Sequence, residues 1–153
     1  MADNFGLKIG IEGEKEFKKA LSEINQSFKV LGSEMKLVSS QFDKNDKSVQ
    51  ALSARNTVLN KEIEAQKNKV EFLRAALQNA ADSFGENDRR TQNWQIQLNN
   101  AEAALNSMER ELSDNERAIE ALSQEETDAA DATERLSQEI ARQEDALAGM
   151  KRA

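Results

Sequence analysis

Residues 47–88 read KSVQALSARNTVLNKEIEAQKNKVEFLRAALQNAADSFGEND and carry an apolar side chain at nearly every third or fourth position. The same spacing continues in one unchanged heptad phase from Phe17 to Met150, a span that contains no proline. Between Phe17 and Phe84, 17 of the 20 seam positions are apolar, whereas the overall hydrophobic fraction of 38% would place about eight there. Such a sustained pattern predicts coiled-coil helices.

The composition agrees with an elongated helical chain. Of the 153 residues, 32% are charged and only 5% are aromatic, with one Trp and no Tyr. Chains of this kind belong with coiled coils and long helices, because they have few bulky side chains for a thick interior. The sequence therefore predicts a narrow buried seam between helices.

A turn between two helices is predicted at residues 84–88. Gly85 lies there in a polar stretch and is followed by Asn87 and Asp88. A glycine stop followed by an Asn or Asp N-cap is typical of a helix-to-helix turn. We therefore expect an all-α fold of long coiled-coil helices that forms an antiparallel hairpin turning near Gly85.

The hairpin has a testable register. If the chain reverses near residue 86, position i faces position 172 − i, and Asn56 falls opposite Asn115. A matched polar pair of this kind fixes register at some cost in stability. The seam residues of the hairpin are Leu52, Asn56, Leu59, Ile63, Val70, Leu73, Leu77, Trp94, Leu98, Leu105, Met108, Leu112, Asn115 and Ile119. The charged residues expected to pair beside this seam are Lys67, Arg74, Glu102 and Glu109.

A continuous rod is the alternative to the hairpin. Because the heptad phase is kept through residues 85–93, the chain also fits one helix of about 130 residues, about 200 Å long and bundled with identical copies. The seam mixes Leu, Ile, Val, Met, Phe and Asn, so it carries no clear signature of two or three strands. The sequence leaves both arrangements open.

Four segments are expected along the chain. Residues 1–13 form a strand-like arm, because Phe5, Leu7, Ile9 and Ile11 alternate with polar residues or glycine. A single strand needs a partner edge from another chain or segment, and a disordered arm is the alternative. The remaining segments are a first helix over 14–45, the helical hairpin over 46–125 and an acidic helical tail over 126–153.

The residue types argue against an enzyme. The chain has no His and no Cys, which excludes nucleophile–histidine pairs, thiolate chemistry and histidine metal sites. The stretch from Asp43 to Asp46 resembles a calcium loop only superficially, because Lys47 and Ser48 occupy positions that need a ligand and a glycine. We expect no catalytic residues, no metal and no cofactor.

Charge argues against nucleic acid as a partner. The net charge is −7, and the 13 basic against 11 acidic residues of positions 1–77 contrast with 8 against 17 in positions 78–153. A nucleic-acid surface needs a concentrated basic patch, which this distribution lacks. We therefore expect no nucleic-acid specificity. No apolar run is long enough to cross a membrane, so we also expect no membrane contact by this segment.

Several stretches resemble a known family. These are LKIGIEGEKEFKKALSEIN at 7–25, SEMKLVSSQFDKNDKSVQAL at 33–52, and the hairpin text that runs from LNKEIEAQ at residue 59 to the FGEN turn and WQIQLNNAEAALNSMERELS at 94–113. They are similar to the N-terminal region of tail tape measure proteins of phages that infect Gram-positive bacteria. The likeness covers roughly residues 5–122.

The resemblance implies a structural virion protein. Such a protein lies in the lumen of the phage tail, sets tail length during assembly in the bacterial cytoplasm, and has no catalytic residues in this region. Its implied partners are copies of itself, with a trimer favoured, together with tail tube proteins, tail tip proteins and tail assembly chaperones. The chain is far shorter than that family, so it would be an N-terminal fragment.

A different class of function also fits the pattern. A coiled-coil chaperone or scaffolding protein could grip its partners with the helical hairpin and then release them. Stoichiometry separates the two hypotheses, because a protein of the tail lumen should form trimers or hexamers, whereas a hairpin chaperone could act as a monomer or dimer.

Overall fold

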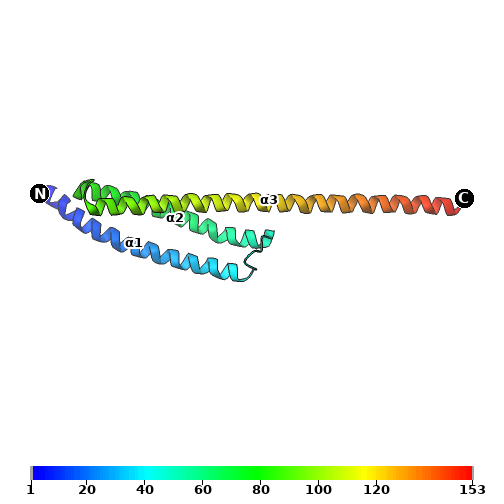
Figure 1. Cartoon of the computed structure of the whole chain (residues 1–153), viewed down its shortest axis with the longest axis horizontal. Helices are drawn as coiled ribbons and strands as arrows, with labels where there is room; N and C mark the ends of the chain where they lie inside the picture. The colour runs from blue at the N-terminus through cyan, green and yellow to red at the C-terminus, as the bar shows by residue number, and fades with distance from the viewer. Residues whose placement is uncertain (1, 153) are drawn as a thin grey trace.

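The computed structural model describes the backbone of residues 2–152 and the side chains of residues 13–150. It contains three helices, α1 (Ala2–Ser40), α2 (Val49–Phe84) and α3 (Arg89–Arg152), and no strand within the described residues. The predicted all-α class is confirmed. Figure 1 shows α2 and α3 side by side and in opposite directions, with α1 along the other side of α2 and the end of α3 projecting alone.

The expected N-terminal strand is wrong, because residues 5–11 lie inside α1. The alternating pattern is short, and no second strand is present among the described residues to pair with it. A lone strand leaves its backbone N–H and C=O groups without partners, whereas a helix pairs them within its own segment. The boundary expected at residue 13 is likewise absent, since α1 passes through it.

A folded linker, residues 41–48, joins α1 to α2. The hydroxyl of Ser48 accepts a hydrogen bond from the backbone N–H of Ala51 at 3.2 Å and caps α2. The guanidinium of Arg55 donates to the carbonyls of Asp46 at 2.7 Å and Asp43 at 3.3 Å. The backbone N–H of Ser48 donates to Asp46 and holds the pKa of that carboxyl below its usual value. The linker therefore has its own network of hydrogen bonds.

The second turn lies between Phe84 and Arg89. Gly85 has a φ of 91°, a conformation that glycine adopts without steric cost, and its N–H donates to the carbonyl of Ala81 at 2.9 Å. Asp88 precedes α3 and accepts a hydrogen bond from the backbone N–H of Arg90 at 2.8 Å, which is an N-cap contact. Together these contacts end α2 and start α3 in the opposite direction.

One cluster of core residues lies where α2 and α3 meet near this turn. It is a single layer of buried apolar side chains, and its members are Val70, Leu73, Ala76, Ala80, Trp94, Leu98 and Ala101. Phe17 and Leu21 of α1 pack against this core from the outside and are half-buried. We call α1, α2 and the part of α3 up to Leu122 the bundle.

Beyond the bundle α3 continues without a neighbour. Every residue from 123 to 150 is exposed, and we call this segment the overhang. The whole of α3 has 64 residues, which corresponds to about 95 Å. The molecule is therefore a short bundle with a long single helix extending from one end (Figure 1).

Candidate functional site

The contact surfaces of the helices are the candidate functional site, and the first of them is the seam between α2 and α3. The side-chain amide of Asn115 donates to Oδ1 of Asn56 at 2.8 Å. Gln66, a second polar residue at a seam position, donates to the carbonyl of Ala101 at 2.9 Å and is buried. Since both polar seam positions have partners, they favour one alignment of the two helices over shifted ones.

The structure brings the expected seam residues together along this interface. The buried members are Leu52, Asn56, Leu59, Ile63, Val70, Leu73, Trp94 and Leu98. The half-buried members are Leu77, Leu105, Met108, Leu112, Asn115 and Ile119. Of these expected residues, the buried ones on α3 are the two nearest Gly85, whereas α2 has buried seam residues along most of its length.

Only part of the expected charge pairing is present. Arg74 approaches Glu102 to 3.1 Å across the two helices and Glu71 to 2.9 Å within α2. Lys67 and Glu109 are described in the structure and form no ion pair with each other. These side chains are exposed, and exposed ion pairs contribute little to stability. Register therefore depends on the apolar layers and the polar seam residues.

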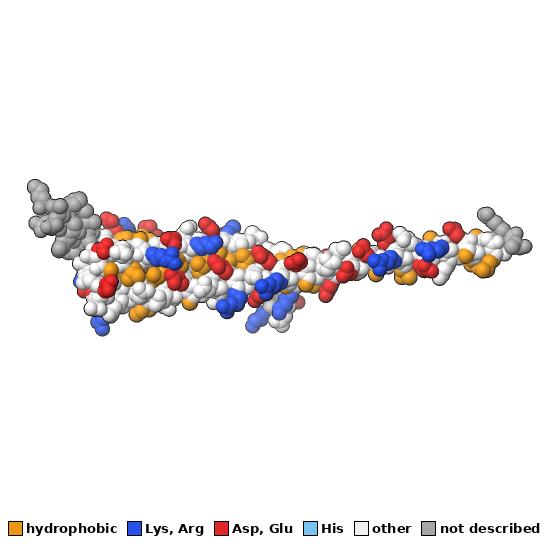
Figure 2. Space-filling view, turned by 90° about the horizontal axis from the view of Figure 1, so that it is seen from above, with side chains coloured by type: hydrophobic (Ala, Val, Ile, Leu, Met, Phe, Trp, Pro, Cys, Tyr) orange, Lys and Arg blue, Asp and Glu red, His pale blue; other side chains and the backbone are white. Residues whose placement is uncertain are grey.

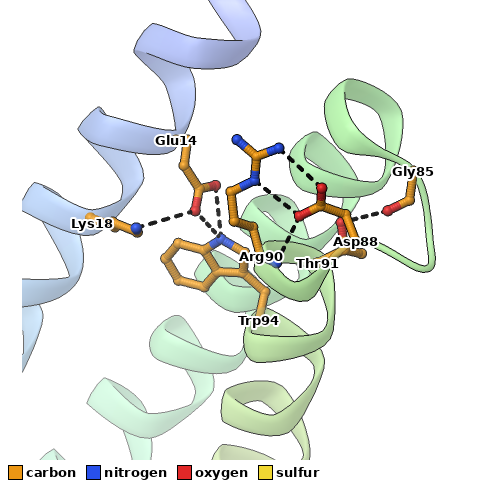
Figure 3. Close-up of polar contacts among 7 residues, drawn as sticks. All are labelled: Glu14, Lys18, Gly85, Asp88, Arg90, Thr91 and Trp94. Carbon is orange, nitrogen blue, oxygen red and sulfur yellow. Dashed lines mark hydrogen bonds and ion pairs between the residues drawn. The ribbon is translucent and has the colours of Figure 1, made fainter.

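The contact that joins α1 to the hairpin was not predicted from the sequence. The indole N–H of Trp94 donates to both carboxylate oxygens of Glu14 at 2.9 Å, and Lys18 lies 3.8 Å from the same carboxylate (Figure 3). Glu14 is 7% exposed and Trp94 is 2% exposed. The signal was available, because Glu14 occupies a seam position one heptad before Leu21.

Aromatic side chains surround this polar contact. The ring of Phe17 lies 5.4 Å from that of Phe72 in α2 and 6.5 Å from that of Trp94 in α3, measured between centroids. Such tilted and edge-on pairs are favourable beyond the area they bury. Phe17 therefore contacts both helices of the hairpin from α1.

Farther along, α1 is held to α2 by exposed polar contacts. Lys69 donates to Asn25 at 2.9 Å and lies 5.2 Å from the centre of the Phe28 ring, while Lys61 lies 3.6 Å from Glu34. Burial lowers the pKa of the Lys69 ammonium. Because the Lys61–Glu34 ion pair is largely exposed, it contributes less to holding α1 than the buried contact at Trp94 does.

An open cavity of about 510 Å³ lies between α1 and the hairpin near the linker. Its apolar lining includes Met35, Leu59 and Met108, and its acidic lining consists of Glu62 and Glu111. Burial raises the pKa of the Glu62 carboxyl, and the nearby charge of Glu111 raises it further. Among the described residues no group of three His, Cys, Asp or Glu side chains could hold a metal ion.

The turn carries a compact charged cluster. Asp88 accepts hydrogen bonds from the guanidinium of Arg90 at 2.9 and 3.0 Å, and these bonds lower the pKa of the Asp88 carboxyl to about 2. The same guanidinium lies 3.4 Å from the centre of the Phe84 ring. The hydroxyl of Thr91 donates to the carbonyl of Gly85 at 2.7 Å (Figure 3), and Asn87 is exposed. These contacts hold the turn in one conformation.

The overhang presents a second surface, which is apolar on one side. Leu136, Ile140, Leu147 and Met150 are 62, 49, 54 and 73% exposed. Figure 2 shows apolar side chains along the bundle and separate apolar clusters along the overhang, with charged residues of both signs between them. Unlike the seam of the bundle, this stripe has no helix packed against it.

Comparisons with models of protein families, with curated proteins and with solved structures found no match. No helix within residues 2–152 combines the length and the apolar character needed to span a membrane.

Proposed function

We propose that this chain is a structural protein that acts through contacts between helices and not through catalysis. The observation that carries the proposal is the apolar stripe of the overhang, which keeps the heptad phase of the bundle and lies exposed. A helix with such a stripe buries it against another helix. The bundle supplies a folded end from which this helix projects.

More specifically, we propose that the chain is the N-terminal segment of a phage tail tape measure protein. The resemblance over residues 5–122 supports this role, with tail tube and tail tip proteins, tail assembly chaperones and further copies of the chain as partners. A helix has a fixed rise per residue, so the overhang can encode length. The folded bundle contributes little length for its number of residues, which favours a docking role for that part.

The hairpin is part of this proposal, and a distance measurement in solution tests it. Because the chain has no cysteine, Lys67→Cys and Glu102→Cys give two unique labelling sites beside the seam. Two spin labels there lie within about 25 Å in the hairpin, whereas a continuous rod separates these positions, 35 residues apart, by about 50 Å. A doubly labelled protein diluted with unlabelled protein gives the distance within one chain, and the longer value would rule out the hairpin.

The length-setting role is tested in the phage that encodes the chain. Removal of residues 123–136, two whole heptads of the overhang, keeps the seam phase and should shorten the tail by about 21 Å if this helix lies extended along it. Electron microscopy of purified virions measures the change. Tails of unchanged length would show that this segment does not act as a ruler.

A chaperone or scaffolding role is the second candidate, favoured by the open cavity between α1 and the hairpin. In that case a partner helix should bind against Met35 and Met108. Met35→Asp should then abolish capture of tail proteins without loss of the hairpin, whereas the matched change Lys36→Asp, at an exposed neighbouring position, should not.

A further inference from the structure

The apolar stripe of the overhang continues the seam of the bundle. Leu136, Ile140, Leu147 and Met150 follow Ile119 and Leu122 in the same heptad phase. Ile119 and Leu122 are half-buried in the bundle, whereas the four residues of the overhang are exposed. Most helical stability in proteins comes from packing of the apolar side and not from helix propensity. The stripe therefore has the character of one half of a coiled coil.

Helices α1 and α2 do not cover this stripe. Helix α3 is continuous from Arg89 to Arg152, and no proline or glycine interrupts the overhang before Gly149. The overhang consequently points away from the bundle (Figure 1). No helix of the described residues is packed on the overhang, and the pattern of charges indicates which partner fits and in which direction.

Charge disfavours a parallel pair of overhangs. Residues 125–134 carry five acidic side chains and no basic one, whereas residues 135–150 carry Arg135 and Arg142 beside three acids. A parallel pair would place the first block against its own copy and Glu126, a seam residue, against the other Glu126. Like charges facing each other at a seam are destabilising. An antiparallel pair places each acidic block, with a net charge of −5, beside the half that contains the arginines, with a net charge of −1, so the repulsion is weaker.

One antiparallel register also matches the seam layers. With residue i of one copy opposite residue 276 − i of the other, Leu136 faces Ile140, Thr133 faces Gln143 and Ala129 faces Leu147. In these three layers apolar side chains meet apolar ones, a small residue meets a large one, and the two polar residues meet each other. At the two ends of the overlap Glu126 faces Met150. The bundle uses the same arrangement, in which the polar Asn56 faces Asn115.

We propose that the overhang is a self-docking surface, which pairs with the overhang of a second copy in this antiparallel register. The two-fold axis passes close to Gln138, and residues 126–150 of each chain overlap over about 37 Å. The two bundles lie at opposite ends, so the free protein in solution is a dimer about 150 Å long. This inference depends only on the overhang and does not rest on the tape measure role. By the criterion of stoichiometry, a dimer in solution accords with the chaperone or scaffolding alternative.

Cross-linking of single-cysteine variants tests whether the two overhangs pair in antiparallel orientation. The full chain contains no native cysteine, so each variant has one thiol. Ala129→Cys and Leu147→Cys, mixed under mild oxidation, should give a disulfide between the two variants. Each variant alone should give none, since two copies of the same residue lie about 27 Å apart in this register. Self-cross-linking of each variant would mean a parallel bundle and would overturn the proposal.

The molecular mass of the assembly in solution tests whether the apolar stripe of the overhang forms the dimer interface. Sedimentation equilibrium of the full chain should give a dimer, and Leu136→Asp should weaken it at least tenfold. Ala141→Asp adds the same charge one residue from Ile140 but off the seam, and should leave the dimer intact. Emission of Trp94, which lies far from the overhang, should be the same in both variants and so shows that the bundle is folded. A monomer at all concentrations, a trimer, or equal effects of the two variants would overturn the proposal.

Discussion

The amide of Asn115 lies 2.8 Å from the amide oxygen of Asn56, across the seam of α2 and α3 and 59 residues along the chain. If α2 and α3 were shifted by one heptad relative to each other, the apolar residues on both sides of this pair would still face apolar residues. Each of the two amides, however, would then face an apolar side chain without a hydrogen-bond partner. The pair therefore selects one register from several that bury similar areas.

Replacement of this pair should separate stability from register. Asn56→Leu alone leaves the Asn115 amide unpaired and should lower the free energy of unfolding by about 1–2 kcal/mol. Replacement of both residues by Leu should raise it above that of the native protein by roughly 1–3 kcal/mol and loosen the register. Urea denaturation of the single and double variants checks this, with Asn68→Leu on the exposed side of α2 as the control. Unchanged stability in all three variants would show that the two amides are not opposed.

The contact between Glu14 and Trp94 should couple α1 to the hairpin. Glu14→Ala and Trp94→Phe, alone and combined, form a double-mutant cycle, for which we expect a coupling energy of about 1–3 kcal/mol. The cycle of Glu16→Ala with Trp94→Phe is the control, since Glu16 is exposed on the same helix. Coupling should be absent there. Equal values in both cycles would contradict a specific role for Glu14.

Acid should weaken the turn through Asp88. Its folded-state pKa of about 2 lies below the ordinary value of 3.8, so its stabilising contribution is complete above pH 3.8 and is lost as the pH falls toward 2. The difference in stability between the native protein and Asp88→Asn should therefore shrink over this interval. Denaturation at several pH values measures it, and a difference that stays constant would show that the carboxylate is not held by Arg90.

Through Glu62, acid should stabilise the folded protein, which is the opposite of its effect through Asp88. Burial and the charge of Glu111 raise its pKa above the ordinary 4.5, so the folded state binds the proton more tightly than the unfolded state and gains stability as the pH falls through the raised pKa. Glu62→Gln should therefore raise the melting temperature at pH 7 and have little effect well below pH 4.5. Glu64→Gln, at an exposed position on the same helix, serves as the control. A lower melting temperature in Glu62→Gln would contradict this assignment.

Two glycines should respond oppositely to alanine. Gly85→Ala forces an L side chain into a φ of 91° and should cost about 1–2 kcal/mol, although no atom crowds the site. Gly32→Ala lies inside α1 with open space around it and should stabilise the protein by about 0.5–1 kcal/mol. Thermal denaturation of both variants checks the pair. Stabilisation by both would mean that Gly85 is not held at a positive φ.

The heptad pattern was enough to predict the all-α class, because the seam spacing holds over most of the chain and no proline interrupts it. The turn chemistry at Gly85 and the polar positions Asn56 and Asn115 together indicated how α2 and α3 could align. Each of these features can be recognised in a short stretch of sequence, without knowledge of contacts between distant residues.

The position of α1 was beyond the sequence analysis. The apolar seam of α1 from Phe17 to Val38 has no polar residue to mark a register, and Glu14, which contacts Trp94, lies one seam position before it. The alternation at residues 5–11 favours a strand because its period is two. In the structure these residues continue the helix of the residues that follow them. The cavity beside Glu62 depends on the angle between α1 and the hairpin, which no local pattern encodes.

The order of the helices determines how the bundle responds to force. The start of α1 and the end of α3 lie at opposite ends of the molecule, and the chain between them runs forward, back and forward again (Figure 1). A pull along the long axis therefore slides α1 and α3 past α2 instead of peeling them away. All layers of a seam then bear the load together, so the bundle should resist stretching up to a threshold and then lengthen abruptly.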